Sequence, residues 1–176
     1  MKTSADLERQ AALQVAALMT AAARTAPKTR GVDNIQILAV DDEPTKQKLI
    51  TKMREIAVKE NRPGFARDAG NIENSPAVLV IGVAAHTAGL NCGFCGKPTC
   101  DALEAANGIC TFNSIDLGIA TASAAEIAGR MHMDNRVMYS IGRAGLDLKF
   151  FDPNVRQALG IPLSVTGKSP FFDRKP

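Results

Sequence analysis

Hydrophobic residues follow two different spacings along this chain, and the two spacings alternate. Near the N-terminus, apolar residues recur every three or four positions, at Leu7, Ala11, Val15, Leu18 and Ala22. This spacing predicts an amphipathic helix, and Thr3 with Asp6 three residues later fits its start. By contrast, the segment 77–85, AVLVIGVAA, is apolar throughout and predicts a buried central strand.

The same signals assign the remaining elements. Strands are expected at 34–40, 77–85, 136–142 and 162–168, and further helices at 44–60, 114–131 and 152–160. Pro44 suits a first helical turn, while Asp152 and Gly160 read as the start and stop signals of the last helix. A loop is expected between 60 and 77. The alternation of helices and strands predicts the α/β class.

Composition limits the number of domains and the classes of partner. A chain of 176 residues, 45% hydrophobic and 22% charged, is long enough for one packed core, so we expect a single domain over residues 1–176. The net charge is only +3, and acidic residues are scattered among the basic ones. Aromatic residues make up 5% of the chain and Trp is absent, so nucleic acid is not an expected partner.

The apolar segment 11–23 superficially resembles a secretion signal. Asp6 and Glu8 precede it where such a signal would be basic, and Gln14 interrupts it. The longest other apolar run, 77–85, is too short to span a bilayer. We therefore expect a cytoplasmic protein with no membrane partner.

All four cysteines lie in one segment, 91–111. Cys92, Cys95, Cys100 and Cys110 have the spacing C-x2-C-x4-C-x9-C, with glycines between them that allow tight wrapping. Thr99 is a candidate N-cap, which would place Cys100 in the first turn of a short helix, where the helix dipole favours a thiolate. We expect these four thiols to be metal ligands.

Four kinds of site could use these four cysteines. Two disulfides would suit a secreted protein, and structural zinc usually takes two C-x2-C knuckles, of which only one is present. A plant-type [2Fe–2S] centre uses C-x4-C-x2-C, the reverse of the order found here. A [4Fe–4S] cluster needs four thiolates at one site, which all four cysteines would provide, and it is the favoured interpretation.

The segment CGFCGKPTCDALEAANGIC resembles the four-cysteine [4Fe–4S] segments of the Rnf-type electron-transport subunit and of the corrinoid iron–sulfur protein. In those families the final cysteine lies further along the chain than Cys110 does here. The chain as a whole resembles a family of uncharacterised ferredoxin-domain-containing proteins. The resemblance implies an iron–sulfur loop at 91–111 and ferredoxin-like electron transfer. His86, which precedes the first cysteine, is the candidate ligand should Cys110 not bind.

A second resemblance covers more of the chain. The run AAARTAPKTRGVDNIQILAV and the late LGIPLSVTGKSP resemble the nitroreductase family, whose members bind flavin. This resemblance implies a three-layer domain with a central sheet and helices on both faces, a homodimer, and an FMN phosphate near Lys28, Arg30 and Lys168. The basic R-R-S-x-R arm by which nitroreductases hold FMN has no counterpart here.

Two functions of different classes follow from these observations. The first is an iron–sulfur redox protein, either an electron carrier or an oxidoreductase, that serves a redox partner protein or a small-molecule substrate. The second is a binding or sensing protein in which zinc or an iron–sulfur cluster only holds the cysteine loop. The sequence names no catalytic residue and no substrate.

Overall fold

A computed structural model describes residues 1–172. Its centre is a four-stranded sheet in the order β1-β2-β4-β3, with every neighbouring pair antiparallel. The strands are β1 (Ile35–Val40), β2 (Val78–Ala84), β3 (Asp134–Asn135) and β4 (Val155–Ser164). The helices are α1 (Ser4–Thr25), α2 (Glu43–Lys59), α3 (Pro63–Asn71), α4 (Cys100–Ala105), α5 (Thr111–Arg130) and α6 (Tyr139–Asp147), with a 3₁₀ turn, η1 (Thr29–Gly31).

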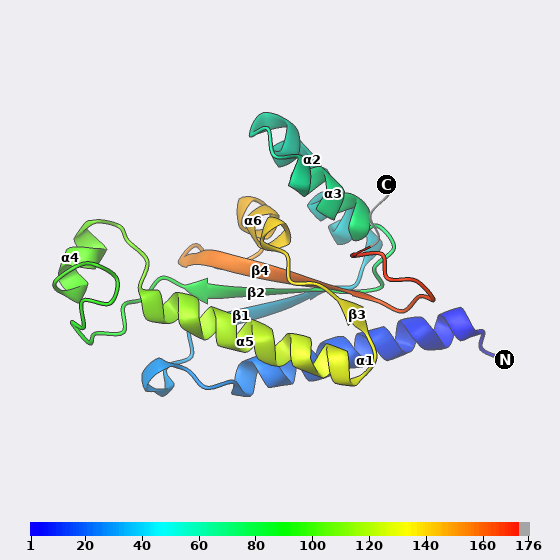
Figure 1. The fold of residues 1–176 in the computed structure, drawn as a ribbon, viewed down its shortest axis with the longest axis horizontal. Coiled ribbons are helices and arrows are strands. Elements are labelled where there is room, and N and C mark those ends of the chain that lie inside the picture. The colour runs from blue at the N-terminus through cyan, green and yellow to red at the C-terminus, as the bar shows by residue number, and fades with distance from the viewer. Residues whose placement is uncertain (173–176) are drawn as a thin grey trace.

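The fold has three layers. Helices α1 and α5 cover one face of the sheet, while α2, α3 and α6 cover the other (Figure 1). The inner strand β2 is buried along its whole length. Its side chains alternate between the two cores: Val78 and Val80 face one, and Leu79 and Ile81 face the other. A strand covered on both faces needs apolar residues at every position, which explains the uninterrupted run 77–85.

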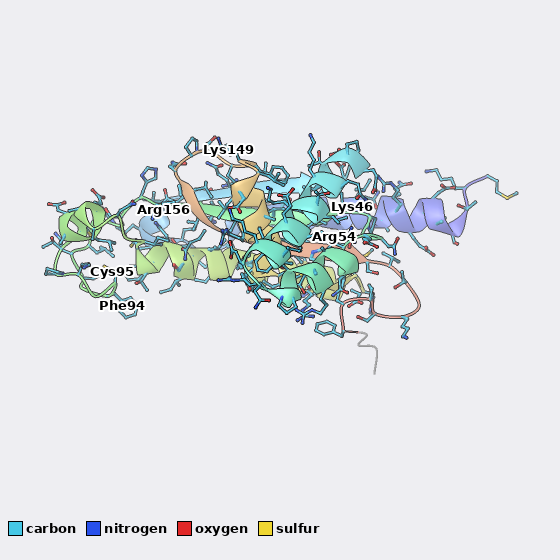
Figure 2. All side chains as sticks on the ribbon, turned by 90° about the horizontal axis from the view of Figure 1, so that it is seen from above. Lys46, Arg54, Phe94, Cys95, Lys149 and Arg156 are labelled. Carbon is cyan, nitrogen blue, oxygen red and sulfur yellow. The ribbon has the colours of Figure 1, made fainter. Side chains whose placement is uncertain are left out.

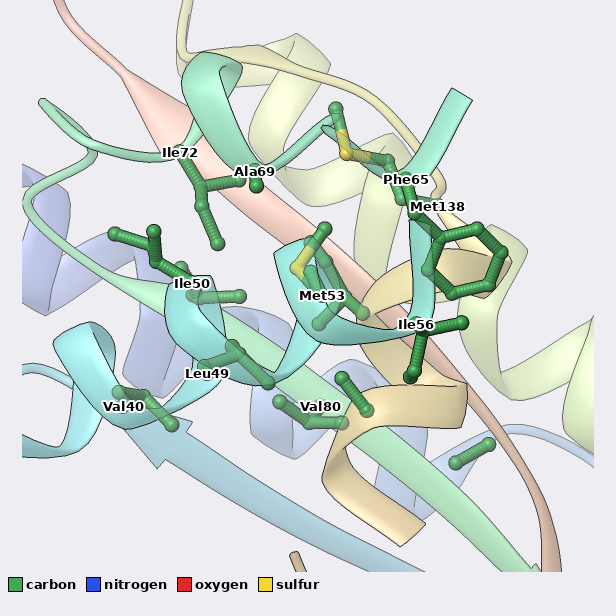
Figure 3. Packing of buried hydrophobic residues seen from close by; sticks show 14 of the residues in the cluster. Val40, Leu49, Ile50, Met53, Ile56, Phe65, Ala69, Ile72, Val80 and Met138 are labelled. Atoms are coloured by element: carbon green, nitrogen blue, oxygen red, sulfur yellow. The ribbon is translucent and has the colours of Figure 1, made fainter. Parts of the chain in front are cut away.

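The core beneath α2 and α3 is closely packed (Figure 3). Leu49 and Met53 of α2 are fully buried, and Phe65 of α3 is 1% exposed. Residues 60–77, expected to be a loop, therefore contain a helix whose apolar side chains complete this core. Pro63 at the start of α3 is the local signal that marks this helix.

Local signals in the first half of the chain are confirmed. Thr3 and Asp6 form a reciprocal capping box at the start of α1. The Thr3 backbone N–H hydrogen bond, followed by that of the Thr3 hydroxyl, holds the pKa of Asp6 below its ordinary value. Pro44 lies in the first turn of α2, as expected.

Within residues 1–172, no helix has the length and apolarity needed to cross a bilayer.

The expected strand at 136–142 is wrong. Only Asp134–Asn135 are in a strand, and residues 139–147 form α6. Ile141, part of the expected strand, is fully buried on the face of α6 that packs on β4. Gly142 makes this packing possible, because a Cβ atom there would lie 1.8 Å from the carbonyl oxygen of Ala158.

The expected helix at 152–160 and strand at 162–168 are also wrong in type or extent. Residues 155–164 form the single long strand β4, which pairs with β2 from Val155 to Pro162. Asp152 is thus no helix cap, and its carboxylate accepts a hydrogen bond from Gln36 Nε2 at 2.7 Å. Pairing with the central strand outweighed the short local helix signal.

Candidate metal centre

The cysteine segment forms a small lobe at one end of the molecule. It leaves the end of β2, turns through α4, and returns at the start of α5 (Figure 1). Because neighbouring strands are antiparallel, the lobe does not lie at a sheet edge formed by the carboxyl ends of several parallel strands. It is an excursion between the central strand and the long helix α5.

The structure brings the four cysteines together around one small pocket. Cys92, Cys95, Cys100 and Cys110 all line it. Cys92 is exposed, Cys95 and Cys100 are half-buried, and Cys110 is 8% exposed. None of the four is in a disulfide. Four free thiols around one surface pocket match the donor set of a thiolate-bound metal group.

Two glycines set the path of the loop. Gly93 and Gly96 have φ values of 71° and 78°, and the Gly96 N–H donates to the Gly93 carbonyl at 2.9 Å. Residues with a Cβ disfavour this left-handed region, so glycine permits the tight turn between the cysteines. Cys95 lies within this turn, and both Cys95 and Cys100 line the pocket.

Two of the sulfurs lie at helix starts, and one of them accepts a backbone hydrogen bond. The Asn91 N–H donates to Cys100 Sγ at 3.4 Å, while Asn91 Oδ1 accepts from the Cys100 N–H at 2.7 Å. Thr99 caps α4, as expected, with its hydroxyl accepting from Ala102 N–H at 3.1 Å. Cys110 is the N-cap residue of α5.

The thiols share a pocket without forming a closed site. Within residues 1–172, no three Cys, His, Asp or Glu side chains are placed as ligands of a single metal ion. Zinc would need four donors within about 2.3 Å of one point. A cluster with one thiolate per iron needs the sulfurs around the group but further apart, which suits side chains that line a common pocket.

The lobe is tied to the sheet by polar contacts from residues distant in sequence. Asn113 of α5 is 2% exposed, and its Nδ2 donates to the carbonyls of Ala84 and His86 at 3.0 and 2.6 Å. Arg156 of β4 donates from Nη1 to the Asn107 carbonyl at 2.9 Å and to Asn107 Oδ1 at 2.8 Å. These contacts fix both the exit from β2 and the approach to Cys110.

An aromatic pair borders the pocket. The Phe94 and Phe112 rings lie 5.6 Å apart between centroids, and both residues line the pocket. Phe94 remains 63% exposed and lies beside Cys95 at the outer end of the lobe (Figure 2). The pocket thus has an aromatic border on one side, while Phe94 and Cys92 remain exposed to solvent.

The three basic residues assigned to a flavin phosphate do not meet within one chain. Lys28 Nζ donates to the carbonyls of Ala23, Arg24 and Ala26 at the end of α1, and Arg30 donates to the Ala88 carbonyl beside the cysteine lobe. Lys168 lies beyond the other end of β2, in a polar pocket with Ser75 and Ser169.

His86 lies at the base of the lobe, where its Nε2 is 3.1 Å from Asn154 Nδ2. It does not line the cysteine pocket. Sequence reasoning missed Asn91, Asn113 and Arg156. Asn91 had a weak signal, because it immediately precedes Cys92, whereas the other two act through contacts between residues far apart in the chain.

Comparison with known proteins identifies relatives of the sequence. Residues 106–174 match the family described as "Uncharacterized protein containing a ferredoxin domain". This segment includes Cys110 but not the other three cysteines. An uncharacterised protein of Archaeoglobus fulgidus is 39% identical over 180 residues, which cover 97% of this chain and 96% of that protein.

Solved structures show the fold. A nitroreductase with bound FMN from Desulfitobacterium hafniense DCB-2 has a TM-score of 0.62 at 14% identity, covering 96% of this chain and 80% of its own. A nitroreductase family protein from Clostridium novyi NT has a TM-score of 0.59 at 15% identity, covering 94% and 77%. The three-layer architecture is therefore nitroreductase-like, as the sequence resemblance implied.

Proposed function

This chain belongs to the family of uncharacterised proteins that contain a ferredoxin domain, and on that basis we propose that it is an iron–sulfur redox protein carrying one [4Fe–4S] cluster. The observation that supports this most strongly is the convergence of Cys92, Cys95, Cys100 and Cys110 on one pocket. In this proposal the four thiolates hold the cluster, which supplies one-electron transfer when it is bound.

The surroundings of the pocket suit a negatively charged thiolate group. The Asn91 N–H points at the Cys100 sulfur, and the positive ends of α4 and α5 lie at Cys100 and Cys110. Such donors stabilise the charge that an iron–sulfur cluster carries, and they tune its reduction potential. Phe94 and Phe112 would exclude water from one side.

The position of the lobe suits electron exchange with another molecule. The lobe lies at one end of the molecule, and Phe94 is at the surface beside Cys95 (Figure 2). Exposed aromatic residues are common anchors in protein interfaces. We propose that a redox partner protein, or a small redox substrate, approaches the cluster from this end.

Single replacement of each cysteine by Ala tests this function. Each variant is expected to lose bound iron and the brown colour of anaerobically purified protein, because each removes one thiolate ligand. Ser123→Ala, a small change far along α5, is the control and should keep the full iron content. Zinc at one ion per chain in the parent protein would instead support the alternative, a metal-stabilised binding or sensing protein.

A polar pocket favours a second cofactor. Lys168 lines it together with Ser75 and Ser169, whose hydroxyls are buried with no hydrogen-bond partner among the described residues. Buried hydroxyls normally have partners, so two unpaired ones beside a lysine suit an anionic group such as phosphate. A solved structure of the same fold contains FMN. We propose weak FMN binding at this pocket, and any contact to Lys28 or Arg30 would then come from a second subunit.

Titration of FMN with protein tests the second cofactor. Binding should quench flavin fluorescence. Lys168→Gln should weaken binding, whereas Lys59→Gln, at the opposite end of α2 from Ser75, should not. Absence of quenching at high micromolar protein would refute flavin binding without affecting the iron–sulfur proposal.

A further inference from the structure

A second pocket lies close to the cysteine lobe, between the end of α6 and the start of β4. Its volume is about 480 Å³, within the range of small-molecule sites. Leu146, Phe151 and Val155 form its apolar wall, and Lys149, Asp152 and Arg156 carry its charges. The proposed redox function makes no use of this pocket.

The apolar wall rests directly on the central strand. A Cβ atom at Gly82 of β2 would lie 2.7 Å from Val155 Cγ1 and 3.2 Å from Phe151 Cε1. The absence of a side chain at Gly82 therefore allows Phe151 and Val155 to pack against the sheet backbone. A wall supported in this way is largely formed before any ligand arrives.

The charged residues favour a small anion. The Asp152 carboxylate accepts a hydrogen bond from Gln36 Nε2, and the backbone N–H of Asp152 donates to Gln36 Oε1 at 3.2 Å. Within residues 1–172, the Lys149 ammonium has no ion-pair partner, and the hydrogen bonds of Arg156 all use Nη1. Two cations and one carboxylate give the mouth a net charge of +1, which matches a monoanion.

Lys149 also has an unfavourable backbone conformation. Its φ is 58°, and its N–H donates to the Leu146 carbonyl at 3.0 Å, at the C-terminal turn of α6 where glycine is usually preferred. A lysine at such a position costs stability relative to glycine. Strained residues of this kind are enriched at binding sites. The strain at Lys149 therefore favours a binding role for its side chain.

We propose that this pocket binds a small aromatic carboxylate. The planar apolar body packs on Phe151 and Val155, and the carboxylate meets Lys149 and the remaining N–H groups of Arg156. Because Arg156 also holds Asn107, the ligand would share the Arg156 guanidinium with the segment that leads into Cys110. The site requires neither iron nor flavin, so it stands or falls separately from the proposed function.

The test is ¹⁹F NMR of 4-fluorobenzoate with the protein as purified. Saturable line broadening is expected, with weaker broadening of the neutral probe 4-fluorobenzamide. Lys149→Gln should weaken 4-fluorobenzoate binding about tenfold, equal to about 1.4 kcal/mol, whereas Lys59→Gln on α2 should leave it unchanged.

Lys149→Gly separates binding from folding, because it removes the charge and also relieves the backbone strain. This variant should bind 4-fluorobenzoate as weakly as Lys149→Gln while unfolding at a higher temperature than the parent. Three outcomes would overturn the proposal: no saturation up to about 10 mM, a range set by millimolar affinity; equal binding of acid and amide; or unchanged affinity in both Lys149 variants.

Discussion

Asn113 is the clearest single test of how the cysteine lobe is held to the sheet. Its side-chain amide donates to the Ala84 carbonyl at 3.0 Å and to the His86 carbonyl at 2.6 Å, and the residue is 2% exposed. Asn113→Ala removes both donors. The Ala84 carbonyl loses this donor in a buried position, whereas the one at His86 is partly accessible to water.

The cost follows from those two environments. A buried group that loses its partner costs about 1–3 kcal/mol, and a partly exposed one costs less, so Asn113→Ala should destabilise the protein by about 2–4 kcal/mol. Urea unfolding of metal-free, reduced protein measures this value. Ser114→Ala is the matched control, because its hydroxyl makes one part-buried bond to Gln157 and should cost about 1 kcal/mol or less.

The same substitution should loosen the lobe. Hydrogen exchange of residues 86–110 should increase more than that of β2, because the amide joins the strand end to the loop. Iron bound to the protein should also be lost faster to a chelator. Equal stability of Asn113→Ala and Ser114→Ala would refute this account of how the lobe is anchored.

Three further predictions concern other parts of the fold. Gly142→Ala should destabilise by about 3 kcal/mol or more in urea unfolding, because its Cβ would meet backbone atoms of β4, whereas Gly129→Ala, with open space around it, should not destabilise. Lys149→Gly should stabilise by about 1 kcal/mol in the same assay, since φ at this position is 58°; a loss of stability would contradict the assigned strain. We also propose a homodimer through the outer faces of α1 and α5, where Leu18 and Ile119 are 47% and 36% exposed; light scattering should report a dimer at micromolar concentration, and a monomer alone would refute it.

Local signals were sufficient for the elements that carry them strongly. The capping box at Thr3, the proline at the start of α2 and the uninterrupted apolar run of β2 each depend on neighbouring residues only. The grouping of the cysteines was also predictable, because all four lie within 19 residues, 92–110. Short-range sequence therefore determines the grouping of the cysteines, the starts of α1 and α2, and the central strand β2, but not α3.

The C-terminal third could not be assigned in this way. Residues 139–147 and 155–164 each have apolar residues at spacings that suit either a helix or a strand, and contact with β2 decides between them. Gly142 ends the strand expected at 136–142, whereas in the structure it allows close packing of α6 on β4. Likewise, Arg156 reaches Asn107 across 49 positions, a contact without any local signal.

The central claim is that the four cysteines hold one [4Fe–4S] cluster. It is tested most directly by counting iron and acid-labile sulfide in anaerobically purified protein and recording the Mössbauer spectrum of the same sample. The account predicts four irons and four sulfides per chain with the spectrum of a single cubane cluster, and loss of that signal in Cys110→Ala. One zinc per chain, two irons per chain, or a fully loaded Cys110→Ala variant would contradict it.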